Sequence, residues 1–233
     1  MENHDNIPIV ENSTVHKWPA LETLERRILG VLIEKAKTTP EAYPLSVNSL
    51  VNGSNQKSNR DPLMNLDDSQ VESTIRSCVA KGLVSLVRGG RVERWQHELY
   101  SKWNLSKRDM SIIGELLLRG PQSEGLLRTR AGRMETFDSL EDLREALDSL
   151  ASRNLIFWVD PKGSRGARVT HGFHSPEELV RIKSTSASIS TDDDQPAKHT
   201  KDSSGLRDLI TGMQVEINKL RDELETLKKQ LGI

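Results

Sequence analysis

The chain has little cysteine, few aromatic residues and no long hydrophobic run. Its single cysteine, Cys78, excludes an intrachain disulfide framework and fits a reducing compartment. No apolar stretch approaches the roughly 18 residues that span a bilayer, and the polar N-terminus lacks the basic and then apolar pattern of a signal peptide. We therefore expect a cytoplasmic protein that makes no contact with membranes.

The chain also lacks an excess of charge of either sign. It has 33 Lys and Arg against 34 Asp and Glu, which gives a net charge of −1. No global basic field therefore indicates nucleic acid, and any binding patch must be local. With 233 residues, 35% hydrophobic and 29% charged, the chain suits about two small domains together with non-globular sequence.

Recognisable catalytic motifs are missing as well. The sequence has no phosphate-binding loop, no dinucleotide fingerprint and no serine or cysteine nucleophile motif. His171 and His174 have the spacing of a metal-binding pair but no third ligand nearby, so we predict no metal site. Cys78 lies on the apolar face of a predicted helix and is expected to be a buried, inert thiol. We predict neither enzymatic activity nor a cofactor.

Apolar residues at helical spacing predict three helices in the N-terminal half, over residues 19–40, 46–51 and 67–82. Ser46 is a candidate N-cap of the second helix, and Asp67 suits the N-terminus of the third. Gly82 stands where a left-handed C-cap belongs. The three segments therefore form a predicted three-helix unit.

The hydrophobic period then changes from helix to strand. Short strands are predicted over residues 83–87 and 92–99. The Gly-Gly pair at 89–90 predicts a two-residue hairpin turn between them. Such a turn would place Arg88 directly opposite Arg91, where like charges disfavour pairing unless an anion lies between them.

The C-terminal half repeats this order. Helical spacing recurs around residues 112–117, 126–127 and 137–150, and strands are predicted over 155–159 and 167–173. Gly120-Pro121 ends the first of these helices, Phe137 is the first of the apolar residues that mark the third, and Asn154 caps it. The order of three helices and a hairpin is typical of a winged-helix domain, in which a two-stranded sheet covers a three-helix core too small to close itself.

An alignment of the two halves supports an internal repeat. Gly30 matches Gly114 at an offset of 84, and Leu83 matches Leu155 at an offset of 72. The first copy is therefore longer by 12 residues, which lie around 40–44 and 55–66. We refer to residues 19–105 as the first repeat and to 106–183 as the second, and predict that they are tandem winged-helix domains. The predicted fold class is mainly α with small β-hairpins.

Three further segments flank the repeats. Residues 1–18 are predicted to be a flexible lead, and the Ser- and Thr-rich residues 184–204 a disordered linker. The tail, 205–233, contains an unbroken heptad seam that predicts a coiled coil. The seam residues are Leu206, Ile210, Met213, Ile217, Leu220, Leu224, Leu227 and Leu231.

The charges that flank this seam favour a parallel homodimer. In a parallel pair of helices, Glu216 faces Arg221 and Glu223 faces Lys228 of the partner, and both contacts are attractive. In an antiparallel pair, acids face acids and bases face bases. The alternative is that the tail folds back onto the repeats.

Two runs in the first repeat resemble a known family. These runs are residues 43–50, YPLSVNSL, and residues 55–62, NQKSNRDP. In them the chain is similar to the YceH-like family of uncharacterised bacterial proteins. The resemblance covers residues 21–172 and implies a tandem winged-helix fold, with no established activity, cofactor or substrate.

Local basic and polar clusters are the candidate site for nucleic acid. Cations on the 55–62 loop and on both hairpins could contact phosphate, and the loop amides could read base edges. The candidate residues are Asn55, Gln56, Lys57, Asn59, Arg60, Arg88, Arg91, Lys162, Arg165 and Arg168. The alternative interpretations are a loop that satisfies its own backbone and ordinary charged hairpin tips.

Both predicted third helices are rich in acids, which phosphates repel. A different basic face could come from Arg128, Arg130 and Arg133. Two functions remain open. The first is a DNA-associated, dimeric regulatory protein, which the basic hairpins and the 55–62 loop favour. The second is a protein–protein adaptor that does not bind DNA, which the acidic third helices favour.

Overall fold

The computed structural model describes residues 18–187 of the chain. The prediction of a flexible lead concerns residues that lie almost entirely outside this range. The same is true of most of the predicted linker, and the whole predicted coiled-coil tail lies outside it. Among the described residues, no helix combines the length and the apolar character needed to cross a membrane.

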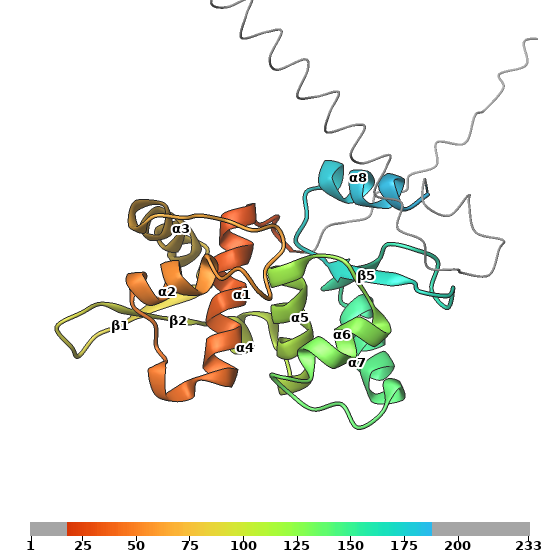
Figure 1. The fold of residues 1–233 in the computed structure, drawn as a ribbon, viewed down its shortest axis with the longest axis horizontal. Coiled ribbons are helices and arrows are strands. Elements are labelled where there is room, and N and C mark those ends of the chain that lie inside the picture. Colours follow the sequence, from red (N-terminus) through yellow and green to blue (C-terminus); the bar gives the residue numbers. More distant parts are fainter. Residues whose placement is uncertain (1–17, 188–233) are drawn as a thin grey trace, which may run out of the picture. The chain divides into compact units, whose positions relative to one another are not determined.

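The first repeat contains the three predicted helices and the predicted hairpin (Figure 1). Its elements are α1 (Thr23–Thr38), the 3-10 turn η1 (Pro40–Ala42), α2 (Val47–Ser54), α3 (Asp68–Ala80), β1 (Val84–Val87) and β2 (Arg94–His97). Ser46 caps α2 by accepting a hydrogen bond from the backbone N–H of Ser49. Asp67 and Gln70 form a capping box at the start of α3, and Gly82 follows α3 with a φ of 67°.

The second repeat has the same order of elements. Its elements are α5 (Lys107–Arg119), β3 (Gln122–Ser123), α6 (Glu124–Ala131), α7 (Leu140–Ser152), β4 (Ile156–Trp158) and β5 (Arg168–His171). All its strand pairs are antiparallel, in the order β3-β5-β4. A single bridge between Leu45 and Trp95 occupies the place of β3 in the first repeat. The described chain is therefore a mixed α and β protein with small antiparallel sheets.

Some elements were not predicted from the sequence. The short helix α4 (Leu99–Trp103) links the repeats, and α8 (Pro176–Ala187) follows the second repeat. Phe137, which apolar spacing assigned to the third helix of this repeat, instead precedes α7, because Ser139 accepts a hydrogen bond from the backbone N–H of Asp142 and is the N-cap. A capped N-terminus fixes where helical dihedral angles begin, whereas apolar spacing alone does not.

The first hairpin has a longer turn than the sequence predicted. β1 pairs with β2 in a register that sets Val87 opposite Arg94, so residues 88–93 connect the strands. Arg88 and Arg91 therefore do not face each other across a two-residue turn. Gly89 adopts a φ of 137°. A glycine pair allows several turn geometries and does not by itself set the loop length.

One continuous hydrophobic core runs through both repeats. Its centre is the contact between α1 and α5, which lie side by side in the middle of Figure 1. Ile28, Leu32, Ile112 and Leu116 are completely buried. The hairpin β1–β2 extends to the left of this view, whereas α6 and α7 cover the opposite side of α5. Folding of the first repeat is thus coupled to that of the second through shared apolar surface.

Candidate nucleic-acid interface

The 55–62 loop is held by its own polar side chains. Asn55 donates from Nδ2 to the carbonyl of Leu66 at 2.8 Å and accepts from the Leu66 N–H at 2.7 Å. Asn59 has a φ of 61° and accepts a hydrogen bond from Arg119 through Oδ1. The N–H of Asp61 donates to the carbonyl of Leu118 at 2.9 Å. The loop therefore connects the first repeat to α5 of the second.

Arg60 lies at the buried end of this loop. Its side chain is 0% exposed, and its Nη2 lies 2.6 Å from Oε2 of Glu34 on α1. Its Nε donates to the carbonyl of Gly53 at 2.8 Å. In this structure the guanidinium is not available to a phosphate. The polar pattern of the loop did not show that Arg60 is buried, because the neighbouring residues are polar whether they are buried or exposed.

Lys57 remains a candidate on the loop surface. It is exposed, and the described residues give it no hydrogen bond or ion pair. Gln56 lies beside it, and both border an open depression that Lys35 and Arg133 also line. Arg133 is partly compensated, because its Nη2 lies 3.4 Å from Oε2 of the buried Glu115. Lys57 is thus the loop cation with the most freedom to meet an anion.

The tip of the first hairpin carries two further cations. Arg88 and Arg91 are exposed, and neither makes a hydrogen bond or ion pair within residues 18–187. Val92 beside them is 59% exposed. Arg94 differs, since its Nη1 donates to the carbonyl of Pro44 at 2.8 Å. The hairpin tip therefore presents two free guanidinium groups to solvent.

The second hairpin is largely neutralised by acids. Lys162 lies 2.6 Å from Asp148 of α7, measured from Nζ to Oδ1. Arg168 lies 2.9 Å from Asp160, measured from Nε to Oδ2. Arg165 is the candidate at this hairpin for which the described part of the chain shows no partner. The two hairpins thus differ, although both were predicted as basic from sequence.

The third helices also differ between the repeats. The exposed face of α7 carries the acids Glu141, Asp142, Glu145 and Asp148. The exposed face of α3 includes Ser69, Ser73 and Arg76, the last of which pairs with Glu72 at 3.2 Å. The exposed face of α3 is therefore less acidic than that of α7.

The remaining residues considered for chemistry are buried. Cys78 lies in the core, and burial raises the pKa of its thiol to about 12. His171 and His174 stack on each other, with ring centroids 3.8 Å apart. Burial lowers the pKa of both imidazoles. Neither histidine belongs to a group of three potential metal ligands among the described residues.

Comparison with known sequences then identifies the family. Residues 21–180 match the family described as "Protein of unknown function, DUF480". The chain belongs to this family. The family is the same as the YceH-like family, so the resemblance seen in the sequence is confirmed.

Curated relatives carry the family designation UPF0502. The chain is 44% identical over 170 residues to a UPF0502 protein of Azotobacter vinelandii, and the matched region covers 71% of this chain and 76% of the relative. It is 42% identical over 173 residues to a UPF0502 protein of Rhodopirellula baltica, covering 74% and 72%. A UPF0502 protein of Pseudomonas aeruginosa is 40% identical over 180 residues, covering 77% and 78%. The DUF480 match spans residues 21–180 and so covers nearly all of the two repeats.

Proposed function

We propose that the repeats are winged-helix domains and that the first of them binds duplex DNA through its hairpin, within a dimeric regulatory protein. The observation that carries this proposal is the pair of uncompensated guanidinium groups of Arg88 and Arg91. An exposed cation with no internal acid is free to release counterions from a phosphate backbone, whereas a paired cation must first give up its partner.

The distribution of charge supports contact at the hairpin rather than at the third helix. Asp67, Asp68 and Glu72 lie at the N-terminal end of α3, and Glu72 already pairs with Arg76. Phosphates repel these acids, so α3 is poorly suited to insert its N-terminal end into the DNA major groove. The proposed contact is therefore mainly with the DNA backbone, and sequence selectivity is expected to be modest.

The test is the salt dependence of DNA binding by the full-length chain. Fluorescence anisotropy with a labelled duplex should show an affinity that falls steeply with salt. Replacing Arg88 and Arg91 together by Ala should reduce the log–log slope by about 2. The matched control is Lys162→Ala, which removes a hairpin cation already paired with Asp148 and should leave the slope unchanged. An unchanged slope in the double variant, or no binding at low salt, would contradict the proposal.

The second candidate function is a protein–protein adaptor. It is favoured by the acidic face of α7, where Glu145 and Asp148 are exposed. Such a face suits a basic protein surface and disfavours nucleic acid. Recovery of the chain from cells, with sequencing of bound DNA and mass spectrometry of bound protein, separates the two functions. A partner that is lost in Glu145→Lys and retained in the Arg88 and Arg91 variant would favour the adaptor.

A further inference from the structure

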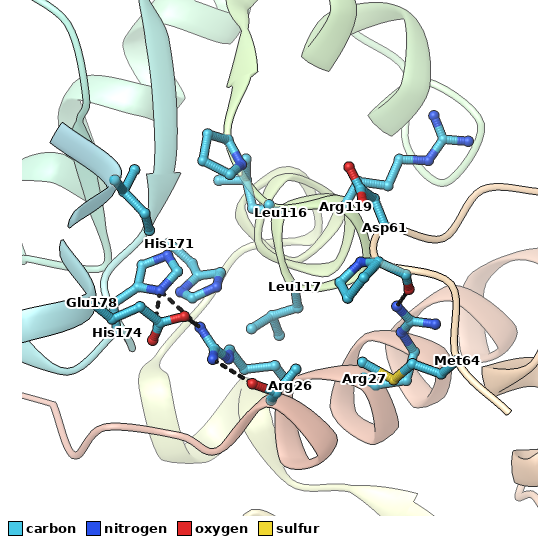
Figure 2. Close-up of a pocket in the computed structure, with 15 residues that line it drawn as sticks. Arg26, Arg27, Asp61, Met64, Leu116, Leu117, Arg119, His171, His174 and Glu178 are labelled. Carbon is cyan, nitrogen blue, oxygen red and sulfur yellow. Dashed lines mark hydrogen bonds and ion pairs between the residues drawn. The ribbon is translucent and has the colours of Figure 1, made fainter. Parts of the chain in front are cut away.

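A cavity of about 340 Å³ lies where the two repeats meet. It is bounded by α1, by the end of the 55–62 loop with Met64 beyond it, by the C-terminal end of α5, and by β5 and α8. Figure 2 shows His171, His174 and Glu178 on one side and Arg27, Met64 and Arg119 on the other, with Arg26 and Leu117 between them. Its volume is at the lower end of the range of small-molecule sites, roughly 300–1,000 Å³.

Three arginines line this cavity, and two of them are paired with carboxylates. Nη1 of Arg26 lies 2.9 Å from Oε1 of Glu178. Nε of Arg119 lies 3.4 Å from Oε1 of Glu115, a carboxylate that is completely buried. Arg27 is the third, and none of the described carboxylates lies within ion-pair distance of it. One positive charge at the cavity wall is therefore left without a direct counter-charge.

Arg27 is buried without an acid partner. The residue is 1% exposed, and its Nη1 and Nη2 donate to the carbonyls of Ser54 and Pro62 at 2.8 and 2.5 Å. Its Nε has no hydrogen-bond partner in the described part of the chain. Burial, followed by the nearby charge of Arg60, lowers its pKa to about 10, and Asp61 opposes this shift. A cation removed from water in this way is stabilised by an anion that reaches its surroundings.

His171 contributes a buried, neutral imidazole to the opposite side. The residue is 2% exposed, and its Nδ1 accepts a hydrogen bond from the N–H of Phe173 at 3.3 Å. Burial, with the nearby His174 and Arg26, holds its pKa well below the usual range, so the ring is neutral at neutral pH. A hydrogen bond between the ring and the backbone of His171 opposes this shift, and the side chain lines the cavity.

The remaining lining residues include the polar Thr23 and Asp61 beside an apolar patch. Leu116 and Leu117 come from α5, Met64 from the chain before α3, and Ile182 from α8. Apolar walls with a few directed polar groups are typical of sites that bind small organic molecules. The lining residues set three arginines against the two carboxylates of Asp61 and Glu178, a net charge of +1 that suits one negative charge better than a phosphate dianion.

We propose that this cavity binds a small organic monocarboxylate, with its carboxylate towards Arg27 and its apolar body against Leu117 and Met64. The site joins α1, α5 and α8, so an occupant holds the two repeats together. This inference does not depend on DNA binding, because Arg88 and Arg91 take no part in the cavity.

The test is isothermal titration calorimetry on the full-length chain at neutral pH. The probes are benzoate, phenylacetate and octanoate, each compared with its alcohol, which has a similar shape but no charge. At least one carboxylate should bind with a Kd of about 1 mM or tighter, and its alcohol should bind at least tenfold more weakly. The proposal is overturned if no carboxylate shows saturable binding up to about 10 mM, or if the alcohols bind equally well.

Two variants locate the binding in this cavity. Arg27→Gln removes the uncompensated charge, and Met64→Trp fills the apolar wall from a half-buried position. Each should weaken binding of the carboxylate at least tenfold, as judged on protein with an unchanged circular dichroism spectrum. If Arg27→Gln does not fold, Met64→Trp decides alone. The matched control is Arg165→Gln, which removes an exposed arginine outside the cavity and should bind like the unaltered chain. Unchanged binding in Met64→Trp overturns the proposal.

Discussion

Gly30 of α1 and Gly114 of α5, which hold the same position in the two sequence repeats, each lie against the helix of the other repeat. A Cβ atom on Gly30 would lie 2.8 Å from Cγ of Leu118, and one on Gly114 would lie 2.6 Å from Cγ2 of Ile33. Both distances are shorter than van der Waals contact. The two equivalent helices therefore pack at a separation that only glycine allows at these positions.

The first prediction follows from this contact. Gly114→Ala should lower the free energy of unfolding by about 1–3 kcal/mol, because the new methyl group overlaps Ile33 and the core must shift. Urea denaturation measures the change. Gly125→Ala on α6 is the matched control, since no atom lies within 4 Å of its Cβ position. The control should stay within about 1 kcal/mol of the unaltered chain. Equal effects at both positions would show that the packing contact is unimportant.

The second prediction concerns the buried pair of Glu34 and Arg60. Glu34→Ala should cost about 3–5 kcal/mol of stability, because it leaves the buried guanidinium of Arg60 without its counter-charge. Replacing both residues by Met should cost less stability than the sum of the losses in Glu34→Met and in Arg60→Met. The control is Glu72→Ala at the exposed pair with Arg76, where about 0.5 kcal/mol or less is expected. Additive losses in the double variant would argue against direct coupling.

The third prediction concerns pH. Burial, opposed by Glu98 and assisted by Lys37, lowers the pKa of His97 from 6.5 to about 4. Below pH 6.5 the unfolded chain therefore takes up a proton that the folded chain does not, and stability falls as the pH decreases. Relative to His97→Phe, the unaltered chain should lose up to about 1.4 kcal/mol per pH unit between pH 6.5 and 4. Chemical denaturation across this range measures the difference, and at pH 8 the gap between the two proteins should be constant. Parallel stability curves below pH 6.5 would contradict the shift.

The fourth prediction concerns residues 205–233, which we propose to form a parallel coiled-coil homodimer. Light scattering should give a dimer for the full-length chain and a monomer for a chain that ends at Thr191. Ile217→Lys should abolish the dimer, because it places a charge in the apolar seam. Lys219→Gln lies outside the seam and serves as the control. A dimer that persists after truncation would assign dimerisation to the repeats instead.

Several features of the fold follow from sequence because their causes are local. Ser46 and Asp67 cap α2 and α3 by hydrogen bonds to residues three positions further on. Asn154 adopts the left-handed conformation, with a φ of 59°, directly after α7. Apolar spacing identified the buried faces of α1, α3 and α5. These signals depend on residues within about one helical turn of each other, and the order of those residues is known from the sequence.

The role of each polar residue in the 55–62 loop was not predictable in the same way. Arg60 and Lys57 are three positions apart, yet one is buried against Glu34 and the other is exposed. Arg60 meets an acid 26 positions away, and Asn59 meets Arg119 at a separation of 60. A local pattern contains no information about which distant side chain will lie opposite.

The sequence by itself therefore determined the family, the order of most helices and strands (though not α4, β3 or α8), and the internal repeat of that order. Tertiary structure alone decided which cations remain unpaired, namely Arg88 and Arg91 at the first hairpin but not Lys162 at the second. It also created the cavity beside Arg27, which draws its walls from four parts of the chain. The physical reason is that helix formation is governed by short-range hydrogen bonds and periodicity. Charge compensation and cavity shape depend instead on contacts that exist only after the two repeats have packed together.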